Sequence, residues 1–266
     1  MIRKIFRARS IIKEYFQRAI NASDAGLSKA EIYDIGAGLV PEILELLNVE
    51  VKMSGLENLI EGPGIIVSNH TSLVDIISLA SFDGRKYFAA KKELFNSPFF
   101  GETFGQGLKA VGLPEVDRSN AREALKKMDE AVEMIKTENS ISQTNTPADS
   151  AYLVVFPEGT RSKSESYEML QFKKTAFKLA VKHNIPIIPV ASYGARNIIK
   201  KGSFRIKPGT IYLKICEPIY SDSFINSEEQ LNSAQIVNKM SEVAKKRIET
   251  GIDELKNNKV QTLYKQ

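Results

Sequence analysis

Short apolar runs alternate with amphipathic stretches over most of this chain, and this alternation is the feature that most limits its fold. The apolar runs have the length of strands and cover residues 50–53, 64–68, 86–90, 152–156, 185–190 and 211–216. The stretches between them have helical spacing and cover residues 72–82, 98–109, 119–138 and 171–182. A long amphipathic helix is expected to begin near Ser227. The pattern predicts an α/β fold with a largely parallel central sheet flanked by helices.

Polar segments follow three of the expected strands. NHTSLVD (69–75) follows GIIVS, FPEGTRS (156–162) begins where YLVVF ends, and AAKKEL closes the run KYFAA. If these strands are parallel, their carboxyl ends meet at one edge of the sheet, where open α/β proteins bind their ligands. We therefore expect the three segments to contribute to one site.

His70 is one of only two histidines in the 266 residues, and Asp75 follows it five positions later. On a continuous helix such side chains point about 140° apart, so contact requires His70 to lie on a turn before the helix. Ser72 is a suitable N-cap that would place Asp75 in the first helical turn. Asp75 would then orient the imidazole through one nitrogen and leave the other as a general base. Alternatively, Asp75 only completes a capping box and His70 only satisfies a carbonyl at the end of the strand.

The group that His70 would activate is expected to belong to the substrate. The sequence contains no G-x-S-x-G elbow, so a serine nucleophile of the α/β-hydrolase kind has no position in this chain. A base acting on a substrate hydroxyl indicates acyl transfer to an alcohol. The backbone amides of Thr71 and Ser72 are candidates for stabilising the oxyanion of that reaction.

FPEGTRS is typical of a turn that binds an anion. Pro157 and Gly159 favour a tight turn directly after a strand. The amides of Gly159 and Thr160, the hydroxyl of Thr160 and the guanidinium of Arg161 would then face the same anion, for which a phosphate is well suited. The alternative is a plain turn in which Glu158 and Arg161 pair with each other.

Four segments resemble, in the same order, the blocks of the glycerophospholipid acyltransferases, a family typified by bacterial lysophosphatidic acid acyltransferase. They are NHTSLVD, KKELFNSPFFG with VGLPEVDR, FPEGTRS, and IPIIPV, and together they span residues 69–190. The resemblance implies that His70 is the general base and Asp75 its partner. It also implies a set of residues that hold the phosphate of the acceptor: Lys91 or its neighbour Lys92, Arg118, Glu158, Gly159, Thr160 and Arg161. The chain departs from the family at Pro114, Glu115 and Val116, where an aromatic and aliphatic run is usual.

The reaction implied by this resemblance moves a fatty acyl group from a thioester donor to the free hydroxyl of a lysophospholipid. Lysophosphatidic acid is the expected acceptor, and the donor is an acyl-carrier protein or a coenzyme A thioester. Acylation of glycerol 3-phosphate or of another lysolipid stays open, because the spacing of the blocks does not separate these reactions. No cofactor is expected, and two histidines with the single Cys216 make a protein-built metal site difficult to assemble.

The N-terminal segment has its own character, and the resemblance to the acyltransferases implies that residues 1–48 are membrane-docking helices ahead of an α/β domain at 49–266. Residues 1–20 combine apolar positions at helical spacing with six cations, namely Arg3, Lys4, Arg7, Arg9, Lys13 and Arg18. A capping box of Ser28 and Glu31 begins a second helix, which glycines and Pro41 interrupt. A basic amphipathic helix suits an anionic lipid surface. The alternative is a helix packed on the protein's own core with a solvated basic face.

Several other protein classes are disfavoured. No apolar run reaches the roughly 18 residues of a membrane span, and the N-terminus lacks the apolar core of a secretory signal, so we expect a peripheral protein on the cytoplasmic face of the membrane. The chain has no recognisable nucleic-acid-binding module. DIGAG (34–38) resembles the loop of S-adenosylmethionine-dependent methyltransferases, but a helix-start pattern precedes it in place of a strand. A non-catalytic membrane adaptor is the remaining rival.

Overall fold

The structure of the chain is a computed structural model, and not every residue is described in it. The described residues are 2–97, 100–141, 146–162, 164, 166–203, 205–225 and 231–264, and side chains are described from Arg3 to Asn257. None of the helices within these ranges has both the length and the apolar character needed to cross a bilayer.

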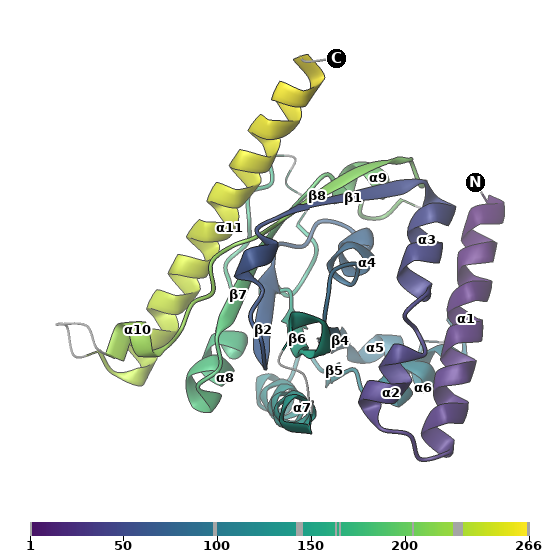
Figure 1. Cartoon of the computed structure of the whole chain (residues 1–266), viewed down its shortest axis with the longest axis horizontal. Coiled ribbons are helices and arrows are strands. Elements are labelled where there is room, and N and C mark those ends of the chain that lie inside the picture. The colour runs from purple at the N-terminus through teal and green to yellow at the C-terminus, as the bar shows by residue number, and fades with distance from the viewer. Residues whose placement is uncertain are drawn as a thin grey trace.

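A six-stranded sheet with the order β1-β8-β7-β2-β6-β3 forms the centre of the molecule (Figure 1). Its strands are β1 (Val49–Ser54), β2 (Gly64–Ser68), β3 (Arg85–Phe88), β6 (Ala151–Val155), β7 (Ile187–Tyr193) and β8 (Gly209–Ile215). Strands β7, β2, β6 and β3 are mutually parallel, whereas β8 runs antiparallel to β7 and parallel to β1. The predicted largely parallel sheet is therefore confirmed, and each predicted strand is present. A separate pair of short parallel strands, β4 (Ala90–Lys91) and β5 (Glu115–Val116), was not predicted.

Helices flank the sheet near the predicted positions. They are α4 (Val74–Leu79), α5 (Lys92–Phe95), α6 (Glu102–Val111), α7 (Ala121–Ile141), α8 (Thr175–His183), α9 (Ala195–Ile198), α10 (Asp222–Ile225) and α11 (Ser233–Tyr264). The helix predicted over 98–109 corresponds to α6, although positions 98 and 99 lie outside the described residues. The closing helix begins at Ser233, later than predicted, since 231 and 232 are not helical and 226–230 are outside the described residues.

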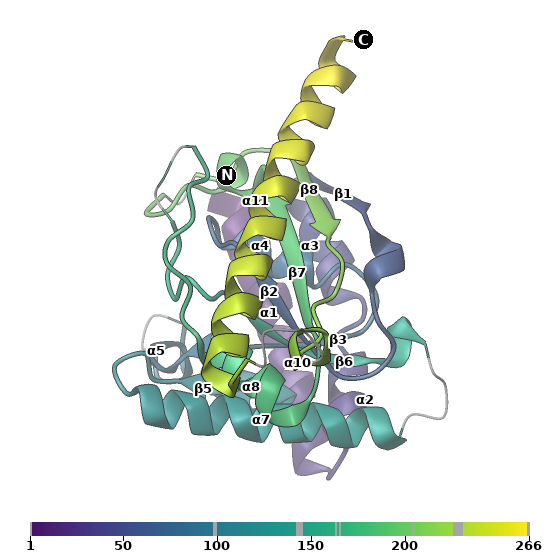
Figure 2. The ribbon, with the colours of Figure 1, turned by 90° about the vertical axis from the view of Figure 1, so that its left-hand side faces the viewer.

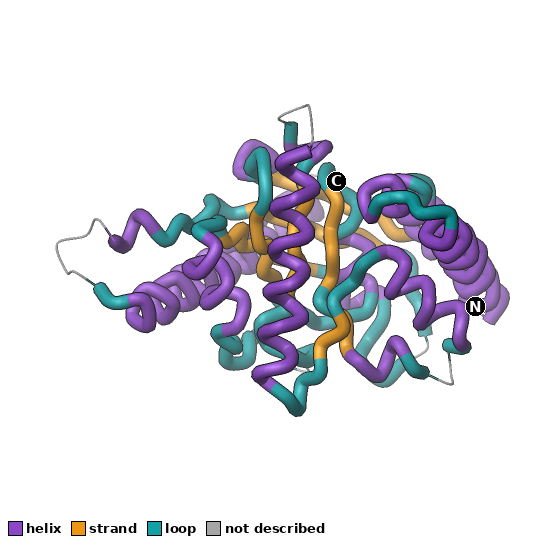
Figure 3. Tube along the Cα trace, turned by 90° about the horizontal axis from the view of Figure 1, so that it is seen from below, coloured by secondary structure: helices purple, strands orange, loops and turns teal. Residues whose placement is uncertain are grey.

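The core lies on both faces of the sheet, because successive strand side chains point in opposite directions. Ile65 and Val67 of β2 pack with side chains of α7, α8 and α11 on one face. Ile66, which lies between them, packs with side chains of α3, α4 and α9 on the other face. Figure 2 shows α11 lying along β7 and β8, and Figure 3 shows the strands enclosed by helices. Because both faces of the sheet are covered by apolar side chains, a polar site has to lie at the loops that follow the strands.

The N-terminal helices pack against the rest of the chain. They are α1 (Ile2–Asp24), α2 (Lys29–Asp34) and α3 (Leu39–Leu47), and the predicted capping box of Ser28 and Glu31 begins α2. On α1, Phe16 and Ala19 are buried with Leu108 of α6. A side chain at Gly107 would collide with the ring of Phe16, so this glycine permits the close approach of α1 to α6. The DIGAG segment joins α2 to α3 with no strand before it, which contradicts a methyltransferase loop.

Candidate active site

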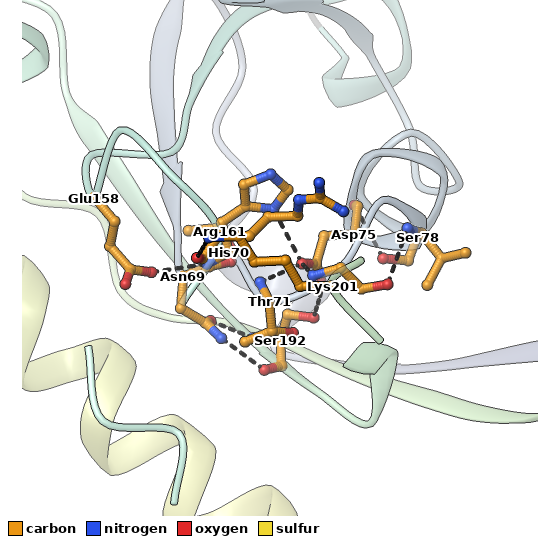
Figure 4. Close-up of polar contacts among 12 residues, drawn as sticks. Asn69, His70, Thr71, Asp75, Ser78, Glu158, Arg161, Ser192 and Lys201 are labelled. Atoms are coloured by element: carbon orange, nitrogen blue, oxygen red, sulfur yellow. Dashed lines mark hydrogen bonds and ion pairs between the residues drawn. The ribbon is translucent and has the colours of Figure 1, made fainter. Parts of the chain in front are cut away.

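His70 and Asp75 are in contact at the carboxyl end of β2 (Figure 4). The Nδ1 atom of His70 lies 3.1 Å from Oδ2 of Asp75, and both side chains are almost completely buried. The chain leaves β2 at Ser68 and reaches α4 at Val74, so His70 lies on the intervening turn, as the spacing predicted. The other ring nitrogen, Nε2, has no hydrogen-bond partner among the described residues. This arrangement is suited to general-base chemistry at Nε2.

Asp75 is held by the turn that precedes it. Its Oδ2 atom accepts hydrogen bonds from the backbone amides of Thr71, at 2.7 Å, and Ser72, at 2.8 Å. The carboxylate therefore accepts the free amides of this turn. The prediction that Ser72 caps α4 is wrong, because Leu73 is the N-cap residue and the Ser72 hydroxyl donates to the carbonyl of Ile199. The two amides are also engaged, which contradicts their expected role in stabilising an oxyanion.

The segment FPEGTRS forms a tight turn directly after β6. Gly159 has a positive φ of 69°, which L side chains rarely adopt, and its amide donates to the carbonyl of Phe156. The carboxylate of Glu158 points inward and accepts from the amides of His70, at 2.9 Å, and Leu170, at 3.0 Å. Burial raises the pKa of Glu158 above its ordinary value. The turn is thus fastened to the backbone of His70 by an acidic side chain that does not face solvent.

Arg161 and Thr160 lie on the outer side of this turn. The amide of Ser162 donates to the carbonyl of His70 at 2.7 Å, so the backbone next to Arg161 lies beside the histidine. Figure 4 shows the side chains of Arg161 and His70 next to each other. The alternative in which Glu158 pairs with Arg161 is not realised, because Glu158 binds backbone amides. Within the described part of the chain, no carboxylate pairs with the guanidinium of Arg161. A cation of this kind beside a base is well placed to receive an anionic substrate.

Lys91 and Arg118 lie in a neighbouring cluster at the β4–β5 pair. Lys91 pairs with Glu93 at 2.8 Å, and Lys92 with Asp117 at 3.4 Å, so each lysine already has a carboxylate partner. Arg118 is exposed just after β5. Among the described residues, neither Lys91 nor Arg118 bonds to the His70–Asp75 pair. The structure therefore joins the first and third motif segments by hydrogen bonds, whereas the two lysines of the second segment pair with carboxylates of that same segment.

Three residues that were not predicted complete the surroundings of the pair. The hydroxyl of Ser192 donates to Oδ1 of Asp75 at 2.9 Å, and Asn69 exchanges two hydrogen bonds with the backbone of Ser192. The ring of Phe156 stacks on His70 with centroids 3.9 Å apart. Asn69 and Phe156 are within the motif segments, and Ser192 is near the carboxyl end of β7, so the shared sheet edge was the signal that could have identified them.

One further polar group at this site lacks a partner. The hydroxyl of Thr71 is buried, and in the described part of the structure it is the one fully buried side-chain polar atom without a hydrogen bond. A buried hydroxyl without a partner is costly, and such a group in a site is available to a bound molecule.

Comparison with known proteins places this geometry in context. A family model described as Acyltransferase matches residues 50–193. The 1-acyl-sn-glycerol-3-phosphate acyltransferase of Saccharomyces cerevisiae is 32% identical over 179 residues, which cover 67% of this chain and 54% of that protein. The corresponding protein of Limnanthes douglasii is 31% identical over 185 residues, which cover 68% and 59% respectively. This chain therefore spans little more than half the length of these curated relatives.

A solved structure resembles nearly the whole chain. The crystal structure of the 1-acyl-sn-glycerophosphate (LPA) acyltransferase PlsC from Thermotoga maritima superposes with a TM-score of 0.64 at 25% sequence identity. The match covers 95% of this chain and 98% of that one. The match therefore extends beyond residues 50–193, the part covered by the family model.

Proposed function

This chain belongs to the acyltransferase family, and on that premise we propose that it transfers a fatty acyl group from a thioester donor to the free hydroxyl of lysophosphatidic acid, which yields phosphatidic acid. The observation that carries the proposal is the contact of His70 with Asp75, since it leaves Nε2 of the buried imidazole as a base beside the guanidinium of Arg161. The relatives named for 1-acyl-sn-glycerol-3-phosphate support this choice of acceptor.

In the proposed reaction, His70 moves one proton. Nε2 accepts the proton of the acceptor hydroxyl while that oxygen bonds to the thioester carbonyl carbon. Asp75 accepts the hydrogen bond of Nδ1 and stabilises the imidazolium. When the carbon–sulfur bond breaks, the imidazolium returns the proton to the departing thiolate. The acyl group is transferred without oxidation or reduction, so the balance requires no redox cofactor.

The phosphate of the acceptor is proposed to bind at the 158–161 turn. Arg161 and the hydroxyl of Thr160 supply the contacts, whereas Glu158 and Gly159 shape the turn, because the carboxylate and the glycine amide are engaged within the protein. Lys91 and Arg118 are proposed to assist once Lys91 exchanges Glu93 for the phosphate. The unpartnered hydroxyl of Thr71 is proposed to bind a substrate oxygen, in place of the amides that Asp75 occupies.

We propose further that the protein works as a peripheral enzyme at the cytoplasmic face of a membrane, with α1 docked on anionic lipid. The exposed side of α1 carries Arg3, Arg7, Lys13 and Arg18, which supports attraction to such a surface. The acyl donor is proposed to be an acyl-carrier protein or coenzyme A thioester.

The test is an acyl-transfer assay of the purified full chain with radiolabelled acyl-carrier protein and acyl-coenzyme A thioesters. The acceptors are lysophosphatidic acid, glycerol 3-phosphate, lysophosphatidylcholine and lysophosphatidylethanolamine, each presented with anionic vesicles. We expect labelled phosphatidic acid as the main product with at least one donor. If glycerol 3-phosphate is labelled in preference to lysophosphatidic acid, the protein is a glycerol 3-phosphate acyltransferase. If no acceptor is labelled by either donor, the proposed activity is wrong and a non-catalytic adaptor becomes the better interpretation.

A further inference from the structure

A small basic cavity lies in the loop that connects α9 to β8, beside the proposed active site. The cavity encloses about 240 Å³. Its lining residues are Asn197, Ile198, Lys200, Ser203, Arg205 and Lys207. Because β8 runs antiparallel to β7, the loop returns to the sheet edge at which β7 ends, and this edge also carries His70. The family model matches residues 50–193, so the cavity belongs to a part of the chain beyond the motif segments.

The cavity is joined to the active-site turn through its backbone. The amide of Lys207 donates to the carbonyl of Ile198 at 2.9 Å, which closes the loop on itself. The carbonyl of the next residue, Ile199, accepts the hydroxyl of Ser72 at 2.7 Å. Ser72 is two residues from His70, and successive Cα atoms are about 3.8 Å apart. Ile199, which lies between two lining residues, is therefore within roughly 15 Å of His70.

The charges around the cavity favour an anion. Residues 184–216 contain the whole lining and no acidic residue. Arg205 and Lys207 are exposed, and among the residues that the structure describes no carboxylate pairs with either side chain. Glu50 comes from the neighbouring strand β1, but it pairs with Lys52. A guanidinium, an ammonium, an amide side chain and a hydroxyl are together well suited to hold a phosphate.

The acyl donor of the proposed reaction brings a phosphate of its own. The phosphate of the acceptor is proposed to bind at the 158–161 turn, whereas coenzyme A and acyl-carrier protein both carry the thioester on a phosphopantetheine arm. About 13 bonds separate the sulfur of this arm from its phosphorus, which is comparable with four extended residues, or roughly 15 Å. With its thioester beside His70, the arm is long enough to place its phosphate at the cavity.

We infer that the cavity between α9 and β8 binds the phosphate of the donor's phosphopantetheine arm, with Arg205 and Lys207 as its cations. The inference rests on the proposed function and deepens it, because it gives the donor a binding site separate from that of the acceptor. The phosphate is common to coenzyme A and acyl-carrier protein, so the same cations serve either donor.

The test uses two donors that differ only in this phosphate, palmitoyl-4′-phosphopantetheine and palmitoyl-pantetheine, with the purified full chain. The double variant Arg205→Gln/Lys207→Gln raises the KM for the phosphorylated donor about tenfold or more and leaves kcat within about twofold. The KM for palmitoyl-pantetheine and the KM for lysophosphatidic acid stay at the wild-type values. The unchanged use of palmitoyl-pantetheine also shows that the variant is folded.

A second double variant controls for the loss of net charge. Lys178→Gln/Lys246→Gln removes two charges from exposed positions of α8 and α11, and it behaves as the wild type with both donors. Palmitoyl-coenzyme A and palmitoyl-acyl-carrier protein then identify the natural source of the phosphate. The KM for whichever of them the wild type accepts rises about tenfold in Arg205→Gln/Lys207→Gln. An unchanged KM for every accepted donor overturns the inference.

Three other results overturn it as well. An equal rise of KM for palmitoyl-4′-phosphopantetheine and palmitoyl-pantetheine means that the substitutions only disturb the loop. A raised KM for lysophosphatidic acid with unchanged donor values assigns the cavity to the acceptor. Weaker sedimentation with anionic vesicles at unchanged donor KM assigns it to lipid head groups.

Failure of the proposed function is separable from failure of this inference. If the wild type transfers no acyl group to any acceptor, calorimetric binding of 4′-phosphopantetheine decides. A Kd raised about tenfold by Arg205→Gln/Lys207→Gln, and not by the control variant, supports the inference. An unchanged Kd, or no binding to the wild type, refutes it.

Discussion

At the scale of single residues, Asp75 has more partners than a histidine–aspartate pair requires. One carboxylate oxygen receives His70 and two backbone amides, and the other receives the hydroxyl of Ser192. Ser192 is itself positioned by the side chain of Asn69, the residue directly before His70. The orientation of the imidazole therefore depends on β7 as well as on the turn after β2.

Removal of the Ser192 hydroxyl tests this arrangement. Ser192→Ala deletes one of the four hydrogen bonds to the Asp75 carboxylate and leaves His70 Nδ1 and both amides in place. We expect kcat to fall by about 10- to 100-fold, because loss of a group that orients a reacting side chain costs activity of this order. The KM for the acceptor should change little, since Ser192 contacts Asp75 and not the phosphate-binding turn. Steady-state kinetics separate the two parameters.

Ser78→Ala is the matched control for that variant. Its buried hydroxyl donates to the backbone carbonyl of Asp75 at 3.0 Å and does not contact the carboxylate. We expect nearly normal kcat for Ser78→Ala. An equal loss of kcat in the two variants would mean that removal of any buried hydroxyl near Asp75 lowers kcat. A normal kcat in Ser192→Ala would mean that Ser192 does not help to orient the Asp75 carboxylate.

At the scale of elements, α1 has a buried part and an exposed part that carries cations. Phe16 and Ala19 are buried against the neighbouring helices, as in a helix packed on its own core. Near its start, however, Phe6 is 65% exposed and lies among the exposed cations Arg3 and Arg7. The buried part fixes the helix to the molecule, and the exposed part is the one proposed to dock on lipid.

Vesicle binding tests the exposed part of α1. We expect Phe6→Ser to weaken partition of the full chain onto anionic vesicles about tenfold or more, because burial of a phenyl ring in an apolar environment contributes about 1.5–3 kcal/mol. Sedimentation with vesicles measures the partition. Ile141→Ser is the control, as Ile141 is 72% exposed at the end of α7, and its replacement should have no effect. Equal binding by the Phe6 variant and the wild type would refute docking through this helix.

The elements also show what the sequence could and could not predict. The strands β2 and β6 were predicted nearly residue by residue, because their apolar runs are short and bounded by polar turns. The direction of β8 was not predictable in the same way, since its alternating pattern suits parallel and antiparallel pairing equally. The brief β4 and β5 were missed because two residues carry no periodicity. Asp75 was identified because it is close to His70 in sequence, whereas Ser192 comes from a distant segment and its contact with Asp75 depends on the strand order.

At the scale of the whole molecule, the site results from the order of the strands. The parallel strands β2, β6 and β7 end at the same edge, so they bring the His70 turn, the 158–161 turn and Ser192 together. The antiparallel β8 brings the loop before it back to this edge, where the ammonium of Lys201 donates to the carbonyl of Arg161. A base, its carboxylate, the hydroxyl of Ser192 and the guanidinium of Arg161 are thereby collected from three segments that are far apart in the chain.

The central claim is that His70 removes the proton of the acceptor hydroxyl, and His70→Ala tests it most directly. The backbone of His70 makes the bonds to Glu158 and Ser162, so the substitution should keep the turn and the melting temperature close to those of the wild type. The measurement is the initial rate of acyl transfer to lysophosphatidic acid at saturating substrates. We expect the rate to fall by about 10²- to 10⁴-fold, the usual contribution of a general base. A folded His70→Ala protein that retains turnover within about threefold of the wild type would contradict the account.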